Sequence, residues 1–198
     1  MEKIKLLIVE DEDDQIEIYK DSIKDFNKEN TINFIYEIYR NENDALYAIE
    51  NNKFDAAFID LSLSKKTSTE EGRNLLNAIQ NNSRYPIFVV SGQIQNIAHE
   101  FNNSFISKHD RSDVDTNQLL ETIKSIYEKG LTKVLNSKGL IETHLNKIFW
   151  NQFSNSRKYW DEHFLNKDEL EKVLSRYTLM HLLEYFQLDD KGQEIKVY

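Results

Sequence analysis

The chain has 198 residues, a formal net charge of −9 and no cysteine. This composition excludes disulfides, thiolate metal sites and thiol catalysis, and the net charge argues against nucleic acid as a partner of the whole chain. The hydrophobic fraction of 39% is enough for a packed core, and no run resembles a membrane span or a secretion signal, so we expect a cytoplasmic protein.

Acidic side chains are concentrated in the longer first part of the chain. Residues 1–125 carry 14 basic and 23 acidic side chains, whereas residues 126–198 carry 11 of each. Such a change in charge is typical of two modules. We predict an α/β domain over residues 1–127 and an α-helical C-terminal region over residues 128–198.

Apolar strand-like segments alternate with amphipathic segments in the first module. Strands are predicted over residues 4–9, 32–39, 87–90 and 105–107, together with a central strand that ends at Asp60. Apolar residues three or four positions apart predict helices around residues 16–26, 43–51, 75–79, 94–101 and 119–127. This alternation predicts a doubly wound sheet of five parallel strands, covered by helices on both faces.

The central strand belongs to the segment FDAAFIDLSL, residues 54–63, in which an apolar run leads to Asp60. A strand that helices cover on both faces is apolar almost throughout, and an unpaired carboxylate inside it would be costly. At the end of the strand, a carboxylate faces the crevice where open α/β sheets bind ligands. Asp60 is therefore a candidate nucleophile, although capping a turn would explain it equally well.

Polar residues follow the other strands too. Glu10 and Asp11 follow the first strand, Ser91 the fourth and Lys108 the fifth, so all of them should meet Asp60 at one edge of the sheet. Clustered carboxylates repel one another unless a cation lies among them, and Mg²⁺ prefers such oxygen ligands. A lysine and a hydroxyl beside such a site suit a phosphoryl group.

These residues resemble the receiver domain of two-component response regulators. The resemblance rests on Glu10 and Asp11 after LLIV, Asp60 after AAFI, Ser91 after FVV and Lys108 after FIS, and it covers about residues 3–127. It implies a flavodoxin-like sheet with strand order 2-1-3-4-5. It also implies a cytoplasmic phosphorelay protein whose partner is a sensor histidine kinase or a phosphotransfer protein.

The resemblance assigns the metal ligands. Asp60 would be the phosphoacceptor and one ligand of Mg²⁺, with Asp11 as a direct ligand. Glu10 would bind the ion through water, and the backbone carbonyl of Ser62 would complete the protein's share of the ligands.

The resemblance also assigns the phosphoryl contacts. Lys108 would pair with the phosphoryl oxygens, and Ser91 would donate a hydrogen bond to them. Phe105 matches the switch aromatic that turns inward with Ser91. Two plainer interpretations remain open: the acidic run at residues 10–14 suits a solvated helix start, and Phe105 suits an ordinary core position.

The sequence departs from the receiver pattern in three places. His109 stands where proline usually follows Lys108, the loop over residues 60–72 is longer than usual, and the segment over residues 91–108 is shorter. We therefore predict a trimmed fourth helix. We also expect phosphorylation to be sensed mainly by residues 64–71, where Lys65 and Lys66 could approach the new charge.

The sequence of the C-terminal region predicts amphipathic helices. The last receiver helix could continue past Gly130, and residues 195–198 are strand-like. Its neutral charge makes DNA binding, the output of many response regulators, the minor alternative. Its aromatic residues favour contacts with a partner protein or a second copy.

We predict that the chain signals through protein contacts or acts as a phosphoryl sink, and that it has no enzyme activity on foreign substrates. A Mg²⁺-dependent phosphatase of the haloacid dehalogenase type is disfavoured, because Ser62 stands where that family has its second aspartate.

Overall fold

The computed structural model describes residues 2–63, 68–136, 139–153 and 167–187. The chain forms two compact units, residues 1–137 and 138–198. No helix in the described ranges is long and apolar enough to cross a membrane.

The first unit is built on one sheet of five parallel strands in the order β2-β1-β3-β4-β5. The strands are β1 (Lys3–Val9), β2 (Asn33–Tyr39), β3 (Ala56–Ile59), β4 (Ile87–Ser91) and β5 (Ile106–Asp110). This is the strand order of flavodoxin-like folds. The predicted fold class and strand order are confirmed.

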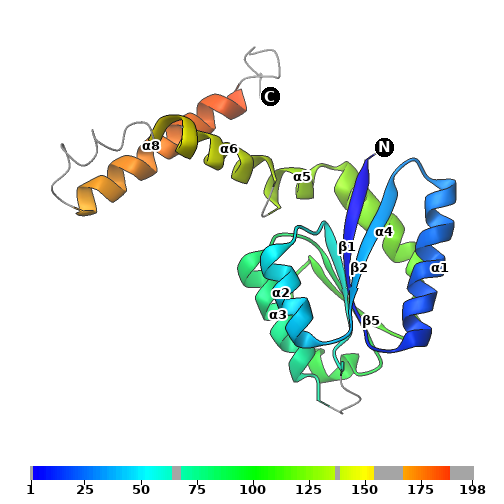
Figure 1. The fold of residues 1–198 in the computed structure, drawn as a ribbon. Coiled ribbons are helices and arrows are strands. Elements are labelled where there is room, and N and C mark those ends of the chain that lie inside the picture. Colours follow the sequence, from blue (N-terminus) through cyan, green and yellow to red (C-terminus); the bar gives the residue numbers. More distant parts are fainter. Residues whose placement is uncertain (1, 64–67, 137–138, 154–166, 188–198) are drawn as a thin grey trace. The chain divides into compact units, whose positions relative to one another are not determined.

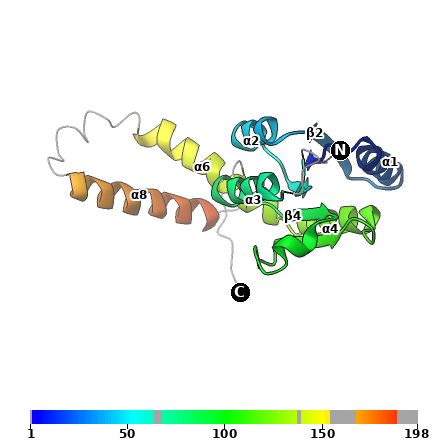
Figure 2. The ribbon, with the colours of Figure 1, turned by 90° about the horizontal axis from the view of Figure 1, so that it is seen from below.

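Helices cover both faces of the sheet (Figures 1 and 2). The helices α1 (Asp13–Glu29) and α4 (Thr116–Glu128) lie on one face, and α2 (Glu42–Asn51) and α3 (Glu70–Asn82) lie on the other. Side chains of β1 alternate between the two cores: Leu6 and Ile8 pack toward α1 and α4, whereas Leu7 packs toward α2 and α3. Burial on both faces is why residues 6–9 of β1 and all of β3 are apolar.

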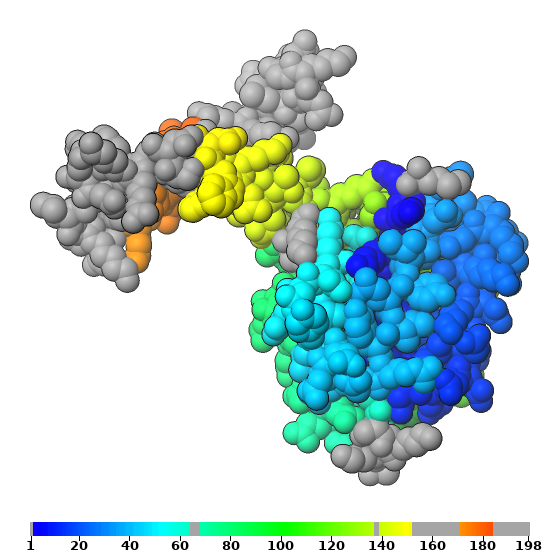
Figure 3. All heavy atoms as spheres, viewed as in Figure 1, coloured from blue at the N-terminus to red at the C-terminus, as the bar shows by residue number. Residues whose placement is uncertain are grey.

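The segments from α1 to α2, coloured blue to cyan, form much of the visible face of the first unit in Figure 3. This face includes the edge strand β2, in which Ile35 and Tyr36 are 40% and 38% exposed. The edge strands β2 and β5 are less buried than β1, β3 and β4. Edge position therefore explains why their sequences are more polar.

One predicted element differs in the structure, and another is shortened as predicted. The fifth strand does not end at Ser107 but runs to Asp110, and only its first residue, Ile106, is fully buried. As an edge strand it can carry polar residues, so no apolar pattern marked its end. The helix predicted around residues 94–101 is reduced to one 3₁₀ turn, η1 (Ile94–Ile97), in agreement with the expected trimming.

The helix α4 does not continue through Gly130. It ends at Glu128, Gly130 adopts a left-handed φ of +82°, and the short helix α5 (Leu131–Leu135) begins after it. Asn136, which is fully buried, donates a hydrogen bond to the carbonyl of Phe54. This contact keeps α5 with the first unit, so the unit extends beyond residue 127.

The described part of the second unit is helical. It contains α6 (Leu140–Ile148), the π-helix η2 (Phe149–Phe153) and α8 (Lys167–Gln187), and α6 contacts α8. Phe149 and Trp150 are 51% and 67% exposed. The strand-like residues 195–198 lie outside the described residues.

Candidate functional site

The candidate site lies at the carboxyl ends of β1 and β3, where the chain connections lead to opposite sides of the sheet. The chain passes from β1 to β2 on one side, and from β3 to β4 and β5 on the other. Open α/β sheets bind ligands at such a point, outside the carboxyl ends of the strands. Glu10 directly follows β1 and Asp60 directly follows β3, and the Asp60 amide donates to the carbonyl of Val9 over 2.9 Å. The register of the two strands therefore sets these two residues side by side.

Glu10, Asp11 and Asp60 form a cluster of carboxylates at this point. Each offers one oxygen atom, and the three atoms lie within 4.8 Å of one another. Glu10 is 1% exposed and Asp60 is 4% exposed, whereas Asp11 is half-buried. The structure thus brings together the three acids that the sequence singles out, while the ligand that they bind stays a prediction.

Burial and mutual repulsion oppose full ionisation of this cluster. Burial, followed by the charge of Asp60, raises the pKa of Glu10 to about 7. Burial also raises the pKa of Asp60, and this is opposed by the Ser91 hydroxyl and the Arg111 guanidinium. A further cation would allow both acids to ionise at neutral pH.

Two serines lie at Asp60. Ser91 ends β4, is 1% exposed, and its side chain hydrogen-bonds to the Asp60 carboxylate, as its predicted place requires. Its hydroxyl oxygen also accepts the amide of Gln93 over 3.2 Å. The backbone of Ser62 hydrogen-bonds to the Asp60 carboxylate, so Ser62 also lies at the site. The use of its carbonyl as a metal ligand stays a prediction.

Arg111 supplies the cation of the site, which the sequence analysis did not identify. It directly follows β5, and one guanidinium nitrogen lies 2.9 Å from a Glu10 oxygen and 3.0 Å from an Asp60 oxygen. Its other terminal nitrogen lies 2.7 Å from a Glu12 oxygen. The side chain is only 20% exposed. The signal in the sequence was a basic residue just after the fifth strand, and it was missed because the end of that strand was placed too early.

Lys108 does not lie where the sequence predicts. It is the third residue of β5, paired with Val89 and not with Ser91, and the Lys108–His109 peptide bond is trans. Its ammonium group donates to the carbonyls of Ile97, over 3.0 Å, and Ala98, over 3.2 Å. The expectation that Lys108 stands at the strand end beside Asp60 is wrong, because β5 runs beyond it.

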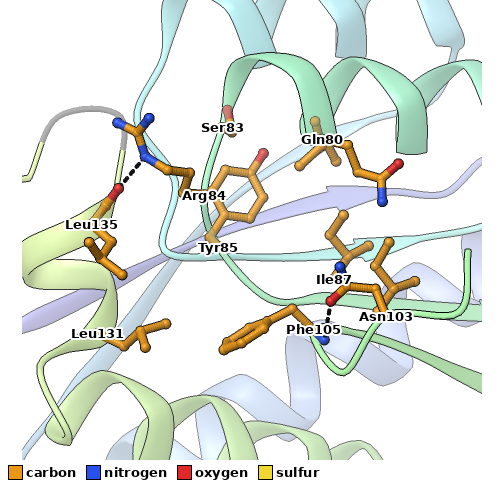
Figure 4. A pocket seen from close by; sticks show the side chains of 11 residues that line it. Gln80, Ser83, Arg84, Tyr85, Ile87, Asn103, Phe105, Leu131 and Leu135 are labelled. Carbon is orange, nitrogen blue, oxygen red and sulfur yellow. Dashed lines mark hydrogen bonds between the residues drawn. The ribbon is translucent and has the colours of Figure 1, made fainter.

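Phe105 is also displaced from the site. It precedes β5 directly, so it lies at the amino end of that strand, whereas Asp60 follows the carboxyl end of β3. Its side chain is 40% exposed and, with Tyr85 and Leu131, lines a cavity of about 360 Å³ (Figure 4). The expectation that Phe105 stands next to Ser91 as a switch aromatic is therefore wrong, and its exposure does not suit the alternative of an ordinary core position.

The residues present fit a hard divalent cation. Three carboxylates at one point outnumber the single guanidinium among them, and burial raises the pKa values of both Glu10 and Asp60. Within the described residues, the Asp11 carboxylate has no ion pair and stays available to a ligand. Lys65 and Lys66, predicted to approach a phosphoryl group, lie outside the described residues.

Comparison with known proteins gave matches among solved structures alone; no family model and no curated protein matches. The chain is similar to a CheY-like response regulator receiver domain protein from Methanospirillum hungatei JF-1, with 24% identity and a TM-score of 0.49, over 64% of this chain and 94% of that one. It is also similar to a CheY-like receiver domain from Methylobacillus flagellatus, with 23% identity and a TM-score of 0.46, over 62% and 98%.

A third similar structure is the receiver domain of the Francisella response regulator 1452, with 19% identity and a TM-score of 0.45, over 64% of this chain and 98% of that one. The matches with receiver domains cover the N-terminal part of the chain.

Proposed function

We propose that the chain is a response regulator that accepts a phosphoryl group on Asp60. The observation that carries this proposal is the setting of Asp60: a carboxylate that is 4% exposed, at the end of a central strand, with the Ser91 hydroxyl, the Arg111 guanidinium and a second buried acid around it. Here the acids outnumber their cation, which suits a site that receives both a metal ion and a phosphoryl group.

The donor is a phosphohistidine of a sensor kinase or phosphotransfer protein. A carboxylate oxygen of Asp60 attacks phosphorus, so an O–P bond forms while the P–N bond to histidine breaks. The electron pair of the broken bond stays on the imidazole nitrogen, which takes a proton. The products are an aspartyl phosphate and a neutral histidine. The Ser91 hydroxyl, which bonds to the carboxylate before transfer, would then donate to a phosphoryl oxygen.

Mg²⁺, when bound, neutralises charge on the transferring phosphoryl oxygens. Asp11 and Asp60 would hold it directly, Glu10 through water, and Ser62 through its backbone carbonyl. This assignment is supported by the proximity of the three carboxylates and by the raised pKa of Glu10.

Transfer to Asp60 would be stoichiometric, with at most self-phosphorylation and self-dephosphorylation. Ser62, two positions after Asp60, offers no carboxylic acid to protonate a leaving alcohol, so turnover of foreign phosphomonoesters is not proposed. Output would pass through protein contacts of the second unit, or the chain would act as a phosphoryl sink. The exposed Phe149 and Trp150 and the balanced charge of residues 126–198 support contacts with protein.

Incubation with acetyl phosphate and Mg²⁺, followed by intact mass measurement, tests the proposal. We expect the wild-type protein to gain one phosphoryl group and Asp60→Asn to gain none, because an amide is a far weaker nucleophile. Asp55→Asn is a matched control, since Asp55 is also largely buried but lies before β3. Modification that persists in Asp60→Asn would contradict the proposal.

A further inference from the structure

The ammonium group of Lys108 donates all of its hydrogen bonds to the connection between β4 and β5. Besides the carbonyls of Ile97 and Ala98, its ammonium group contacts the carbonyl of Glu100 and the side-chain oxygen of Asn102, which lies at 3.2 Å. An ammonium has three protons to donate, so these oxygens use all of its donors. Lys108 therefore has no donor left for a phosphoryl group unless this loop comes apart.

The connection held by Lys108 contains a strained residue. Phe101 has a φ of +50°, a left-handed conformation that is rare for a bulky side chain. Such a conformation persists only where its surroundings enforce it. The contacts of Lys108 with residues on both sides of Phe101 provide that enforcement, so this lysine has a structural task.

Arg111, and not Lys108, lies at the carboxyl end of β5 beside Asp60. It follows Asp110, which pairs with Ser91 in the register of β4 and β5, so it emerges at the same edge as the Ser91 hydroxyl. Its guanidinium already lies 3.0 Å from a carboxylate oxygen of Asp60. A phosphoryl group on Asp60 would therefore form within reach of this cation.

The chemistry of the guanidinium suits that contact. It is always charged, and its planar fork of donors matches two oxygens of a phosphoryl group. In addition, its Nε is buried without a hydrogen-bond partner among the described residues. A buried donor without a partner is costly, so an incoming anion that accepts from it would relieve this cost.

We propose that Arg111 is the cation that contacts the phosphoryl group on Asp60, while Lys108 anchors the β4–β5 connection. This inference rests on the proposed function of Asp60. During transfer, negative charge shifts onto the phosphoryl oxygens, and Arg111 moves its hydrogen bond from the Asp60 carboxylate to these oxygens. Glu10 and Glu12, its other partners, keep the guanidinium aimed at the site.

Phosphorylation rates at saturating Mg²⁺ test this, with acetyl phosphate as donor and intact mass as readout. We expect Arg111→Gln to be about 100-fold slower than wild type, the usual effect of losing one well-placed donor to the transition state. Arg111→Lys should be intermediate, because it keeps the charge but loses the fork. Arg73→Gln is the matched control, since Arg73 pairs with Glu100 outside the site, and it should stay within a few-fold of wild type.

Lys108→Met separates the two roles. It should lower the melting temperature and slow phosphorylation far less than Arg111→Gln does. Binding of beryllofluoride with Mg²⁺ gives a second readout, and its dissociation constant should rise in Arg111→Gln more than in Lys108→Met. If circular dichroism shows that Arg111→Gln does not fold, the phosphorylation rate and the beryllofluoride dissociation constant of Arg111→Lys are compared with those of wild type instead.

The outcomes are distinct. If wild type gains no phosphoryl group on Asp60, the proposed function fails and this inference fails with it. If wild type is modified but Arg111→Gln matches or exceeds its rate, Arg111 is only a charge compensator and this inference alone is overturned. A 100-fold loss in Lys108→Met with a small loss in Arg111→Gln would overturn it equally.

Discussion

Glu10 is the most buried acid of the carboxylate cluster, and its protonation couples the site to folding. Its side chain accepts the backbone amides of Asp11 and Glu12, each over 3.1 Å, and contacts Arg111. These contacts favour the ionised form. Burial and the charge of Asp60 act against it and prevail, so the pKa in the folded protein rises from 4.5 to about 7.

This shift predicts how stability depends on pH without Mg²⁺. Between about pH 4.5 and 7 the folded protein holds a proton on Glu10 that the unfolded chain has released, so the free energy of unfolding falls as pH rises. The shift corresponds to about 3 kcal/mol, all of it lost above pH 7. Urea unfolding in EDTA from pH 5 to 8 would measure it. Glu10→Gln should flatten this dependence, and an unchanged slope in that variant would contradict the prediction.

At the scale of the element, α3 packs closely on the loop after β3 through a glycine. An ideal Cβ at Gly72 would lie 2.5 Å from the Cα and 3.0 Å from the carbonyl oxygen of Leu61. The Gly72 amide donates to that same carbonyl over 3.3 Å. The contact is with backbone, so a rotamer change cannot relieve it, and Leu61 directly follows Asp60.

We therefore predict that Gly72→Ala is destabilising by about 1–3 kcal/mol, the usual cost of overpacking. Gly92→Ala is the matched control, because a Cβ there meets nothing within 4 Å. Chemical denaturation of both variants would give the comparison. Equal stability of Gly72→Ala and wild type would show that the helix can move away from the loop at no cost.

The elements also show what the sequence can predict. Residues 6–9 of β1 and all of β3 are buried and apolar, so the ends of these two strands, and with them Glu10 and Asp60, could be placed from the sequence. The edge strand β5 reads ISKHD, with little apolar pattern, and its end was placed too early. That error put Lys108 at the strand end, where the structure has Arg111. An edge strand is half solvated, so hydrophobicity does not encode its length.

The boundary of the first unit could not be predicted for a similar reason. The α5 helix is only five residues long, and its attachment depends on polar contacts as well as packing. Asn136 donates to the carbonyl of Phe54, and Lys133 pairs with Glu2 over 2.9 Å. Such pairs join residues far apart in the sequence and leave no periodic pattern.

At the scale of the whole molecule, the distribution of charge decides which partners are favoured. Residues 1–125 carry an excess of acidic side chains, and residues 126–198 carry 11 basic and 11 acidic ones. Duplex binding depends on basic side chains that neutralise phosphates. An acidic first unit repels the duplex, and a neutral second part offers no compensating excess of positive charge.

We predict that the full chain does not bind DNA specifically, with or without beryllofluoride and Mg²⁺. Fluorescence anisotropy with labelled duplexes at physiological salt should show only weak binding that is insensitive to sequence, because the phosphate contribution is small. Titration at low salt serves as an internal control: any residual binding there should vanish as salt rises. Tight binding to one duplex over a shuffled duplex of equal length would contradict the prediction, and would make the second unit a DNA reader in place of a protein-contact module.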